Sequence, residues 1–182
     1  MNKNLPLSNI VVLDLTNVLS GPFATQILSD LGAEIIKVEK PNGDDSRKFG
    51  PFIKKRSSYF ISLNRGKKSI VVDFNNEEDK KIFKKLLAIS DVIIDNFKPG
   101  TLEKYGFSSS YLKKNFPLLI QTKISGFGET GPLKENPAYD MIVQAMGGIM
   151  SITGKDKNET YRVGSSIGDI VAGLYAVIGV LT

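Results

Sequence analysis

The sequence predicts an α/β fold in which helices flank a parallel β-sheet. Short β-branched runs alternate with stretches of helical spacing along most of the 182 residues. Alternation of this kind is typical of a parallel sheet. The composition, with 41% hydrophobic and 24% charged residues, is that of an ordinary globular protein. A chain of this length can bury one sizeable core. We therefore expect the whole chain to form part of a single domain.

In the first part of the chain we expect one helix among several strands. Phe23, Ile27, Leu28 and Leu31 share a helical face, and Gly32 ends the pattern. The segment that follows the second strand is polar and rich in Gly, Pro, Asp and Lys, which indicates a loop. The predicted elements are a helix at 22–31, a loop at 40–56 and strands at 10–14, 34–39, 58–63 and 69–74, with a turn at 64–67 joining the last two strands.

The second part of the chain continues the alternation. A helix is expected at 76–90, because Asn75 or Asn76 can cap it and three acidic residues follow in its first turn. Its buried stripe consists of Ile82, Phe83, Leu86 and Leu87. The remaining predicted elements are strands at 91–97 and 117–127, short helices near 101–105 and 108–114, and helices at 140–150 and 169–182.

The composition excludes several kinds of site. The chain has no cysteine and no histidine, so disulfides, thiol nucleophiles, Cys/His zinc sites and histidine-based triads cannot form within it. We expect no metal. The net charge of +5 suits an anionic ligand such as a phosphorylated cofactor. The basic residues form no stripe interleaved with aromatics, so we expect no nucleic acid partner.

The apolar segments argue against a membrane. The longest apolar run, residues 170–182, is shorter than the roughly 20 residues that span a bilayer. The N-terminal sequence lacks the apolar core of a signal peptide. We expect a cytoplasmic enzyme.

A glycine-rich segment, residues 126–131, matches G-x-G-x-x-G and follows a strand. The dinucleotide fingerprint also needs a helix that begins inside the motif. Pro132 and Pro137 follow closely, and helical periodicity resumes only near residue 140. We therefore interpret this segment as a surface loop, one that can still border a site because glycines allow close backbone approach.

Three loops follow predicted strands and are candidates for a ligand rim. Ligands of open α/β sheets bind beyond the carboxyl ends of the strands. The loops are residues 16–21, "EKPNGDDSR" and "DNFKPG", and the last two carry Lys or Arg that could bind phosphate. The alternative is that they are ordinary solvated loops.

Asp169 is the most unusual residue of the sequence. It follows a glycine, precedes a largely apolar run, and has no basic residue within six positions. A carboxylate beside apolar packing is costly unless it is paired or used. It could cap the helix that follows, act as a general base, or act as a nucleophile. The residues alone leave these three interpretations open.

Six stretches of the sequence together resemble a known family. They are "VVLDLTNVLSGPFATQILSDLGAEIIKVEKPNGDDSR", "YFISLNRGKKSIVVDF", "DVIIDNFKPGTLEKYGF", "ISGFGETGP", "PAYDMIVQAMGGIMSITG" and "GSSIGDIVAGLYAVIGVLT". In this order and spacing they resemble the family III coenzyme A transferases, such as formyl-CoA transferase and carnitine CoA-transferase (the CaiB/BaiF family). The resemblance implies a Rossmann-like fold, with residues 1–182 as the N-terminal part of the large CoA-binding domain.

The resemblance implies a role for Asp169. In the family, a carboxylate at this position attacks an acyl-CoA thioester, and CoA passes through an aspartyl anhydride and an aspartyl-CoA thioester to a small carboxylic acid. It further implies CoA contacts around residues 137–140 and at Leu19, Ser20, Lys40, Val72, Asp73, Phe74, Asn75, Asn96, Phe97, Lys98, Lys104, Tyr139 and Asp140.

Some positions depart from well-known members of the family. Lys40 and Lys104 stand where arginine occurs, and Asn75 and Pro137 stand where formyl-CoA transferase has lysine.

The resemblance leaves two alternatives open. One is the sister branch of 2-methylacyl-CoA racemases, which use a His–Asp pair, although this chain has no histidine. The other is a non-catalytic CoA-binding or assembly subunit. Family members are about twice this length and form interlocked homodimers. We therefore expect the small domain and the C-terminal return segment to be absent from this chain.

Overall fold

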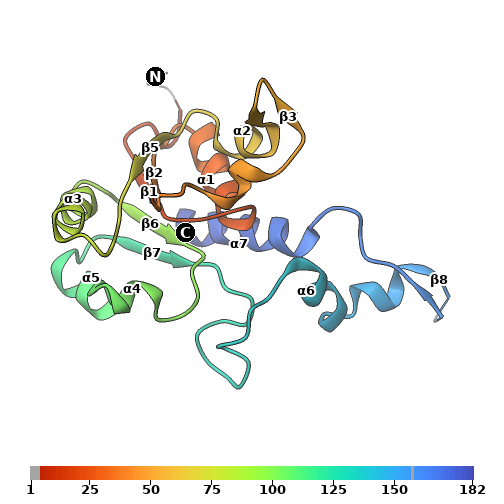
Figure 1. The fold of residues 1–182 in the computed structure, drawn as a ribbon. Coiled ribbons are helices and arrows are strands. Elements are labelled where there is room, and N and C mark those ends of the chain that lie inside the picture. The colour runs from red at the N-terminus through yellow and green to blue at the C-terminus, as the bar shows by residue number, and fades with distance from the viewer. Residues whose placement is uncertain (1–4, 157) are drawn as a thin grey trace.

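A computed structural model describes residues 5–156 and 158–182. Its centre is a five-stranded sheet in the order β5–β2–β1–β6–β7 (Figure 1). All four pairings in this sheet are parallel. The strands are β1 (Val11–Asp14), β2 (Glu34–Glu39), β5 (Lys68–Val71), β6 (Val92–Asp95) and β7 (Ile120–Lys123). The predicted α/β class with a parallel sheet is confirmed.

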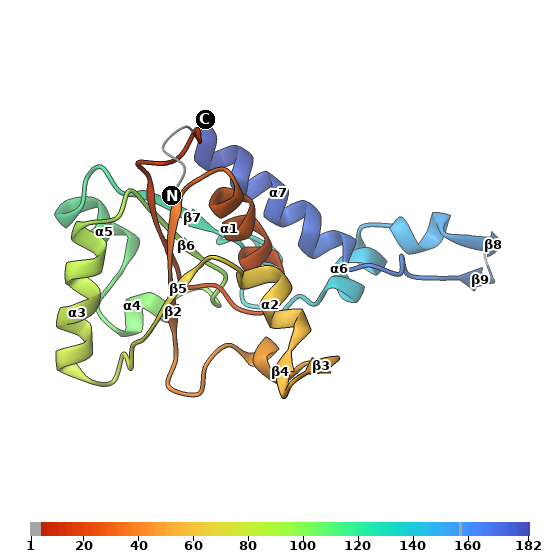
Figure 2. The ribbon, with the colours of Figure 1, turned by 90° about the horizontal axis from the view of Figure 1, so that it is seen from above.

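Helices cover both faces of the sheet (Figure 2). On one face, α1 packs against α7. The other face carries three helices from the middle of the sequence, as Figure 2 shows. The bounds are α1 (Ser20–Asp30) and α7 (Ile167–Leu181) on the first face, and α3 (Glu77–Ala88), α4 (Thr101–Lys104) and α5 (Ser109–Asn115) on the second.

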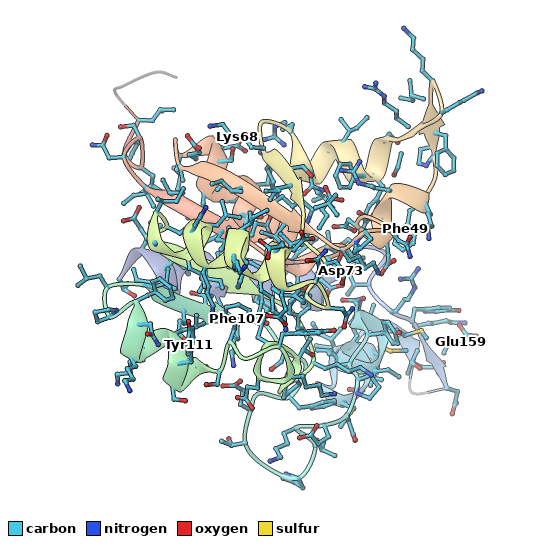
Figure 3. All side chains as sticks on the ribbon, turned by 60° about the vertical axis from the view of Figure 1, so that its left-hand side comes forward. Phe49, Lys68, Asp73, Phe107, Tyr111 and Glu159 are labelled. Carbon is cyan, nitrogen blue, oxygen red and sulfur yellow. The ribbon has the colours of Figure 1, made fainter. Side chains whose placement is uncertain are left out.

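Each face of the sheet has its own apolar core, as alternate strand residues require. Val12 and Ile94 point towards α1 and α7, where they join Leu28 and Val177. Leu13 and Ile93 belong to the opposite cluster, which contains several aromatic rings. In this cluster the rings of Phe107 and Tyr111 meet edge to face with centroids 5.8 Å apart (Figure 3).

One predicted strand is wrong. Residues 58–63 begin the helix α2 (Ser58–Asn64) and do not form a strand. The hydroxyl oxygen of Ser57 accepts a hydrogen bond from the backbone N–H of Phe60 at 3.0 Å and so caps the helix. The segment before it also contains structure that we predicted as loop: the 3₁₀ helix η1 (Asp45–Lys48) and a hairpin of β3 (Phe52–Ile53) and β4 (Arg56–Ser57). The cap outweighs the strand propensity of "SYFISL".

The segment between β7 and α7 projects from the body of the molecule (Figures 1 and 2). It contains α6 (Asp140–Met146), the 3₁₀ helix η2 (Ile149–Ile152) and the hairpin of β8 (Gly154–Asp156) and β9 (Glu159–Thr160). Glu159 marks this hairpin in Figure 3. As we predicted, no helix begins within the glycine-rich residues 126–131, and the next helix, α6, starts at Asp140.

The contact between α1 and α7 depends on a glycine. A Cβ atom placed on Gly173 would lie 2.6 Å from the carbonyl oxygen of Ser20 and 3.1 Å from the ring of Phe23. Both the oxygen and the helix backbone are fixed, so a larger residue would push the helices apart. Asp169 lies one turn before Gly173 on the same face of α7. The close contact therefore holds Asp169 beside the beginning of α1.

We expect Gly173→Ala to destabilise the full-length protein, although alanine favours helix by ~1 kcal/mol. Overpacking costs about 1–3 kcal/mol and should outweigh this gain. Gly179→Ala is the matched control, because nothing described lies within 4 Å of the added methyl group. Chemical denaturation should show lower stability for the first variant and equal or higher stability for the second. A stabilised Gly173→Ala protein would contradict the close contact.

No helix among residues 5–156 and 158–182 combines the length and the apolar character needed to cross a bilayer.

Candidate active site

The candidate site lies at the carboxyl ends of the parallel neighbours β1 and β6, from which the chain continues to opposite sides of the sheet. The strand order changes direction between β1 and β6, and ligands of such sheets bind in the crevice beyond this point. The loops after these strands are joined there by two hydrogen bonds. The backbone N–H of Asn17 donates to Oδ1 of Asn96 at 2.9 Å, and Nδ2 of Asn96 donates to the carbonyl of Asn17 at 2.8 Å.

The loop after β1 is held in an unusual conformation. Val18 has a φ of 66°, which is a genuine outlier for a β-branched residue and costs roughly 1–3 kcal/mol. Its backbone N–H donates to Oδ1 of Asp44 at 3.3 Å. Gly21 closes the loop, because a Cβ atom there would lie 2.2 Å from the side chain of Thr16. Strain of this kind persists only where the surroundings impose it, and a buried polar network supplies that constraint.

The first half of this network is an ion pair below the loop. Nζ of Lys67 lies 3.1 Å from Oδ2 of Asp14, and both side chains are almost completely buried. Lys67 also donates to the carbonyl of Pro22, to Thr25 and to Asn64. Burial alone would raise the pKa of Asp14, but Lys67, Lys37 and two threonine hydroxyls together hold it well below its usual range. Burial lowers the pKa of Lys67, and the Asp14 carboxylate opposes this change.

The second half of the network ties β2 to the loops. Lys37 is buried, donates to the carbonyl of Thr16 at 2.7 Å and pairs with Asp44 at 3.0 Å. Oδ1 of Asp44 also accepts hydrogen bonds from Ser46. The two buried cations thus hold one backbone carbonyl at each end of the loop after β1, that of Thr16 and that of Pro22.

Asp169 is the third residue of α7. The helix begins at Ile167 with Ser166 as its cap residue, so the N-cap interpretation of Asp169 is wrong. Among the described residues, the Ser166 hydroxyl makes no capping hydrogen bond. Instead, the backbone N–H of Gly168 donates to Oδ1 of Asp140 at 2.8 Å. A side chain on α6 therefore caps the helix that carries Asp169.

The absence of a side chain at Gly168 serves packing. A Cβ atom there would lie 3.1 Å from Oδ1 of Asp140 and 3.3 Å from the side chain of Val143. The glycine therefore allows α6 to approach the start of α7.

The Asp169 carboxyl group is half-buried. Among the described residues, no hydrogen bond or ion pair reaches its oxygens. Burial raises its pKa, and the neighbouring Asp140 carboxylate raises it further. A carboxylate without a partner at the first turn of a helix keeps its lone pairs available, which suits a nucleophile or a base.

Tyr59 on α2 is a neighbour of Asp169 that sequence reasoning missed. Burial raises the pKa of its phenol, and the charges of Asp169 and Asp44 raise it further. The phenol therefore stays protonated at neutral pH and can donate a hydrogen bond. The sequence showed only a tyrosine in a segment predicted as a strand. Side chains repeat every two residues in a strand but every 3.6 residues in a helix, so the strand prediction gave Tyr59 the wrong direction.

The residues expected to contact CoA follow four strands at the same edge of the sheet. Leu19 and Ser20 follow β1, Lys40 follows β2, residues 72–75 follow β5, and residues 96–98 follow β6. Phe74 stacks on Tyr105 with ring centroids 5.2 Å apart, which brings the loop after β5 next to Lys104 at the end of α4. Parallel pairing therefore places these segments on one rim.

Other expected contacts have different surroundings. Lys40 pairs with Asp45 at 2.8 Å. The Asp73 carboxylate accepts two bonds from Asn75, while Val72 is buried in the core. Tyr139 is 77% exposed, and Asp140 bonds to Gly168 and Gln144. The Asp140 carboxylate, which we expected at the CoA site, thus accepts a structural hydrogen bond from Gly168, the residue before Asp169.

Asp95, at the end of β6, begins the predicted rim loop "DNFKPG", but sequence reasoning assigned it no role of its own. It lines a pocket together with Phe97, Lys98 and Lys123. Burial raises its pKa to about 6, against the opposing effects of the Phe97 N–H and Lys123. A strand-end aspartate was visible in "VIIDNF", but its burial depends on the packing of α4 and β7.

We expect Asp95→Asn to stabilise the protein at neutral pH. The folded carboxyl group keeps its proton up to about pH 6, whereas an unfolded aspartate loses it near pH ~4. Stability is therefore lost as the pH rises between these values, by up to roughly 3 kcal/mol. Denaturation curves of the variant and the wild type should diverge at pH 7 and converge at pH 4. Equal stabilities at both pH values would contradict the raised pKa.

The part of the chain that the structure describes contains no group of three or more acidic side chains that could hold a metal ion.

Comparison with known proteins places the chain in a family. The family model described as CoA-transferase family III matches residues 7–182. The chain belongs to this family. Acetyl-CoA:oxalate CoA-transferase of Acetobacter aceti is 47% identical over 177 residues, which are 96% of this chain and 46% of that protein. Succinyl-CoA:glutarate CoA-transferase of Homo sapiens is 44% identical over 178 residues, 97% of this chain and 41% of that protein.

Solved structures agree with the family III assignment. A CaiB/BaiF family protein from Brucella suis superimposes with a TM-score of 0.94 and 44% identity, over 98% of this chain and 49% of that one. A hypothetical protein from Mycobacterium tuberculosis gives a TM-score of 0.90 and 34% identity, over 99% and 50%. The chain thus spans about half the length of the relatives it matches.

Proposed function

We propose that the protein transfers coenzyme A from an acyl-CoA donor to a carboxylic acid, with Asp169 as the nucleophile. The observation that carries this proposal is the Asp169 carboxyl group: half-buried, raised in pKa and without a partner among the described residues. Membership of family III supports it. The chain offers no histidine or cysteine as an alternative nucleophile.

The first half of the proposed reaction loads CoA onto the enzyme. A carboxylate oxygen of Asp169 attacks the thioester carbonyl carbon, the C–S bond breaks, and an aspartyl acyl anhydride and a CoA thiolate result. The thiolate then attacks the Asp169 carbonyl carbon, which releases the donor acid and leaves an aspartyl-CoA thioester. The second half reverses these steps with the acceptor carboxylate and regenerates Asp169.

The surroundings of Asp169 suit these steps. No cation among residues 5–156 and 158–182 pairs with the carboxylate, and burial removes water that would otherwise shield its lone pairs. Its raised pKa also makes it more basic than an exposed aspartate. Backbone N–H groups near the glycines around the site could bind the oxyanions of the tetrahedral intermediates. The residues on the strand-end rim would hold the CoA moiety, and two of them, Lys40 and Lys104, would meet its phosphates.

We further propose that the acceptor is a small dicarboxylic acid. Similar proteins are named for oxalate, glutarate and mesaconate. Those names belong to the relatives, and they define the first compounds to test.

The transfer assay uses the full-length protein with acetyl-CoA or succinyl-CoA as donor and oxalate, glutarate or mesaconate as acceptor. Mass spectrometry should detect a new acyl-CoA that appears only when both substrates are present. Tight CoA binding without any transfer would favour a non-catalytic binding subunit. Rapid incorporation of solvent deuterium at the acyl α-carbon would favour the racemase alternative.

A further inference from the structure

We propose that Gln144 is a positioning residue that sets the place of Asp169 through a clamp between α6 and the segment before α7. This inference rests on the proposed function, because it assigns Gln144 a part in the reaction of Asp169. Gln144 touches neither substrate nor reacting atoms, and it acts through Asp140 and the backbone of residues 163–168.

The clamp is a set of hydrogen bonds at one buried side chain. Gln144 is 2% exposed. Its Oε1 accepts a bond from the backbone N–H of Val163 at 2.8 Å. Its Nε2 donates to Oδ2 of Asp140 at 2.6 Å and makes a longer contact, 3.4 Å, with the carbonyl of Ser165. One glutamine thus holds both ends of the segment that leads to the nucleophile.

Asp140 passes this constraint on to α7. Its other oxygen, Oδ1, accepts the bond from the Gly168 N–H at 2.8 Å. Gly168 is the residue immediately before Asp169, and within the described part of the chain the side chain of Ser166 does not cap the helix. The start of α7 is therefore fixed by Asp140, and the Asp140 carboxylate is oriented by Gln144.

The chemistry explains why an amide is needed at position 144. A glutamine donates and accepts at the same time, so it satisfies a carboxylate and a backbone N–H together. An apolar side chain would fill the space but would leave both groups without their bonds. The Asp140 carboxylate could then rotate, and Asp169 would move with the helix end. A displacement of about 1 Å at a reacting group can lower a rate on the order of 10²-fold.

The test compares Gln144→Met and Gln144→Leu with Gln26→Met in the full-length protein. Gln26 is a matched control because it is also buried, at 4% exposure, while the bond that its side chain makes among the described residues goes to Asp30 on its own helix, α1. We expect kcat of the Gln144 variants to fall on the order of 10²-fold with KM for the acyl-CoA within threefold. Gln26→Met should keep kcat within twofold even if its melting temperature falls equally. Unchanged kcat in a folded Gln144 variant would overturn the proposal.

Hydrogen–deuterium exchange provides a readout that does not depend on activity. In the wild type, the amides of Val163 and Gly168 should both exchange slowly. Replacement of Gln144 should speed exchange at both, although only Val163 bonds to it directly. Rapid wild-type exchange at either amide, or acceleration at Val163 alone, would overturn the clamp. If the wild type transferred no CoA, only the proposed function would fail. The hydrogen–deuterium exchange at Val163 and Gly168 would still test the clamp.

Discussion

Asp169→Ala in the full-length protein is expected to lower kcat for CoA transfer by at least about 10³-fold, because no other group can replace an attacking carboxylate. The fold should survive, since the side chain of Asp169 makes no hydrogen bond or ion pair among the described residues. Its loss also removes a repulsion with the Asp140 carboxylate. Steady-state kinetics and thermal denaturation measure the two effects. Asp169→Asn, which keeps the shape, should be equally inactive.

Glu78→Gln is the matched control for this result, because Glu78 also lies in the first turn of a helix but is exposed on α3. It should transfer CoA within twofold of the wild type. Near-normal turnover by Asp169→Ala would remove Asp169 from the mechanism, whatever the control does.

The pH dependence follows from the direction of the pKa shift. Burial and the Asp140 carboxylate raise the pKa of Asp169, and only its ionised form can attack. Activity should therefore fall as the pH drops through a value above the ~4 of an exposed aspartate. The other titratable neighbour, Tyr59, has a raised pKa and remains neutral across this range. An acidic limb at or below pH ~4 would contradict the raised pKa.

The second large effect is expected on replacement of Lys67, and the adjacent Lys68 provides the control. Lys67→Met should destabilise the protein by about 3–5 kcal/mol, because it leaves the buried Asp14 carboxylate without its cation. Lys68→Met is the control. Lys68 pairs with Glu34 on the surface, with its side chain 61% exposed, and exposed pairs contribute less than about 1 kcal/mol. Denaturation of both variants at pH 7 measures the difference, and similar small losses would contradict the buried network.

The difference in free energy of unfolding between Lys67→Met and the wild type should become smaller in acid. The folded pKa of Asp14 is held below its unfolded value, so its stabilisation is complete above pH ~4 and is lost as the pH falls further. The variant has little of this stabilisation to lose. A gap that stayed constant from pH 6 to pH 3 would show that Asp14 does not carry the effect.

The centre of the sheet could be predicted from the sequence because the strands β1, β2 and β6 are buried, whereas the edge strands β5 and β7 are largely exposed. Runs such as residues 10–14 and 91–97 are apolar whatever surrounds them, and Asn76 caps α3 as predicted. The predicted buried stripe of α3 is wrong in one residue, because Ile82 is 42% exposed while Phe83 and Leu87 are buried. Residues 58–63 were predicted wrongly because "SYFISL" has strand propensity. Its helix depends on the cap at Ser57 and on packing against α1, which only the folded chain supplies.

The candidate site was predictable in chemistry but not in geometry. Asp169 stood out because a lone carboxylate before an apolar helix needs a reason. Lys67 and Gln144 did not stand out, because lysine and glutamine are usually exposed, and their partners lie far along the chain.

The central claim is that Asp169 forms a covalent acyl intermediate, and chemical trapping tests it most directly. The full-length protein is incubated with an acyl-CoA donor and hydroxylamine, which converts an aspartyl anhydride or thioester into a stable hydroxamate. Peptide mass spectrometry then locates the modified residue. We predict a hydroxamate at Asp169 that requires the acyl-CoA. A hydroxamate at another carboxylate, or none during active transfer, would contradict the mechanism.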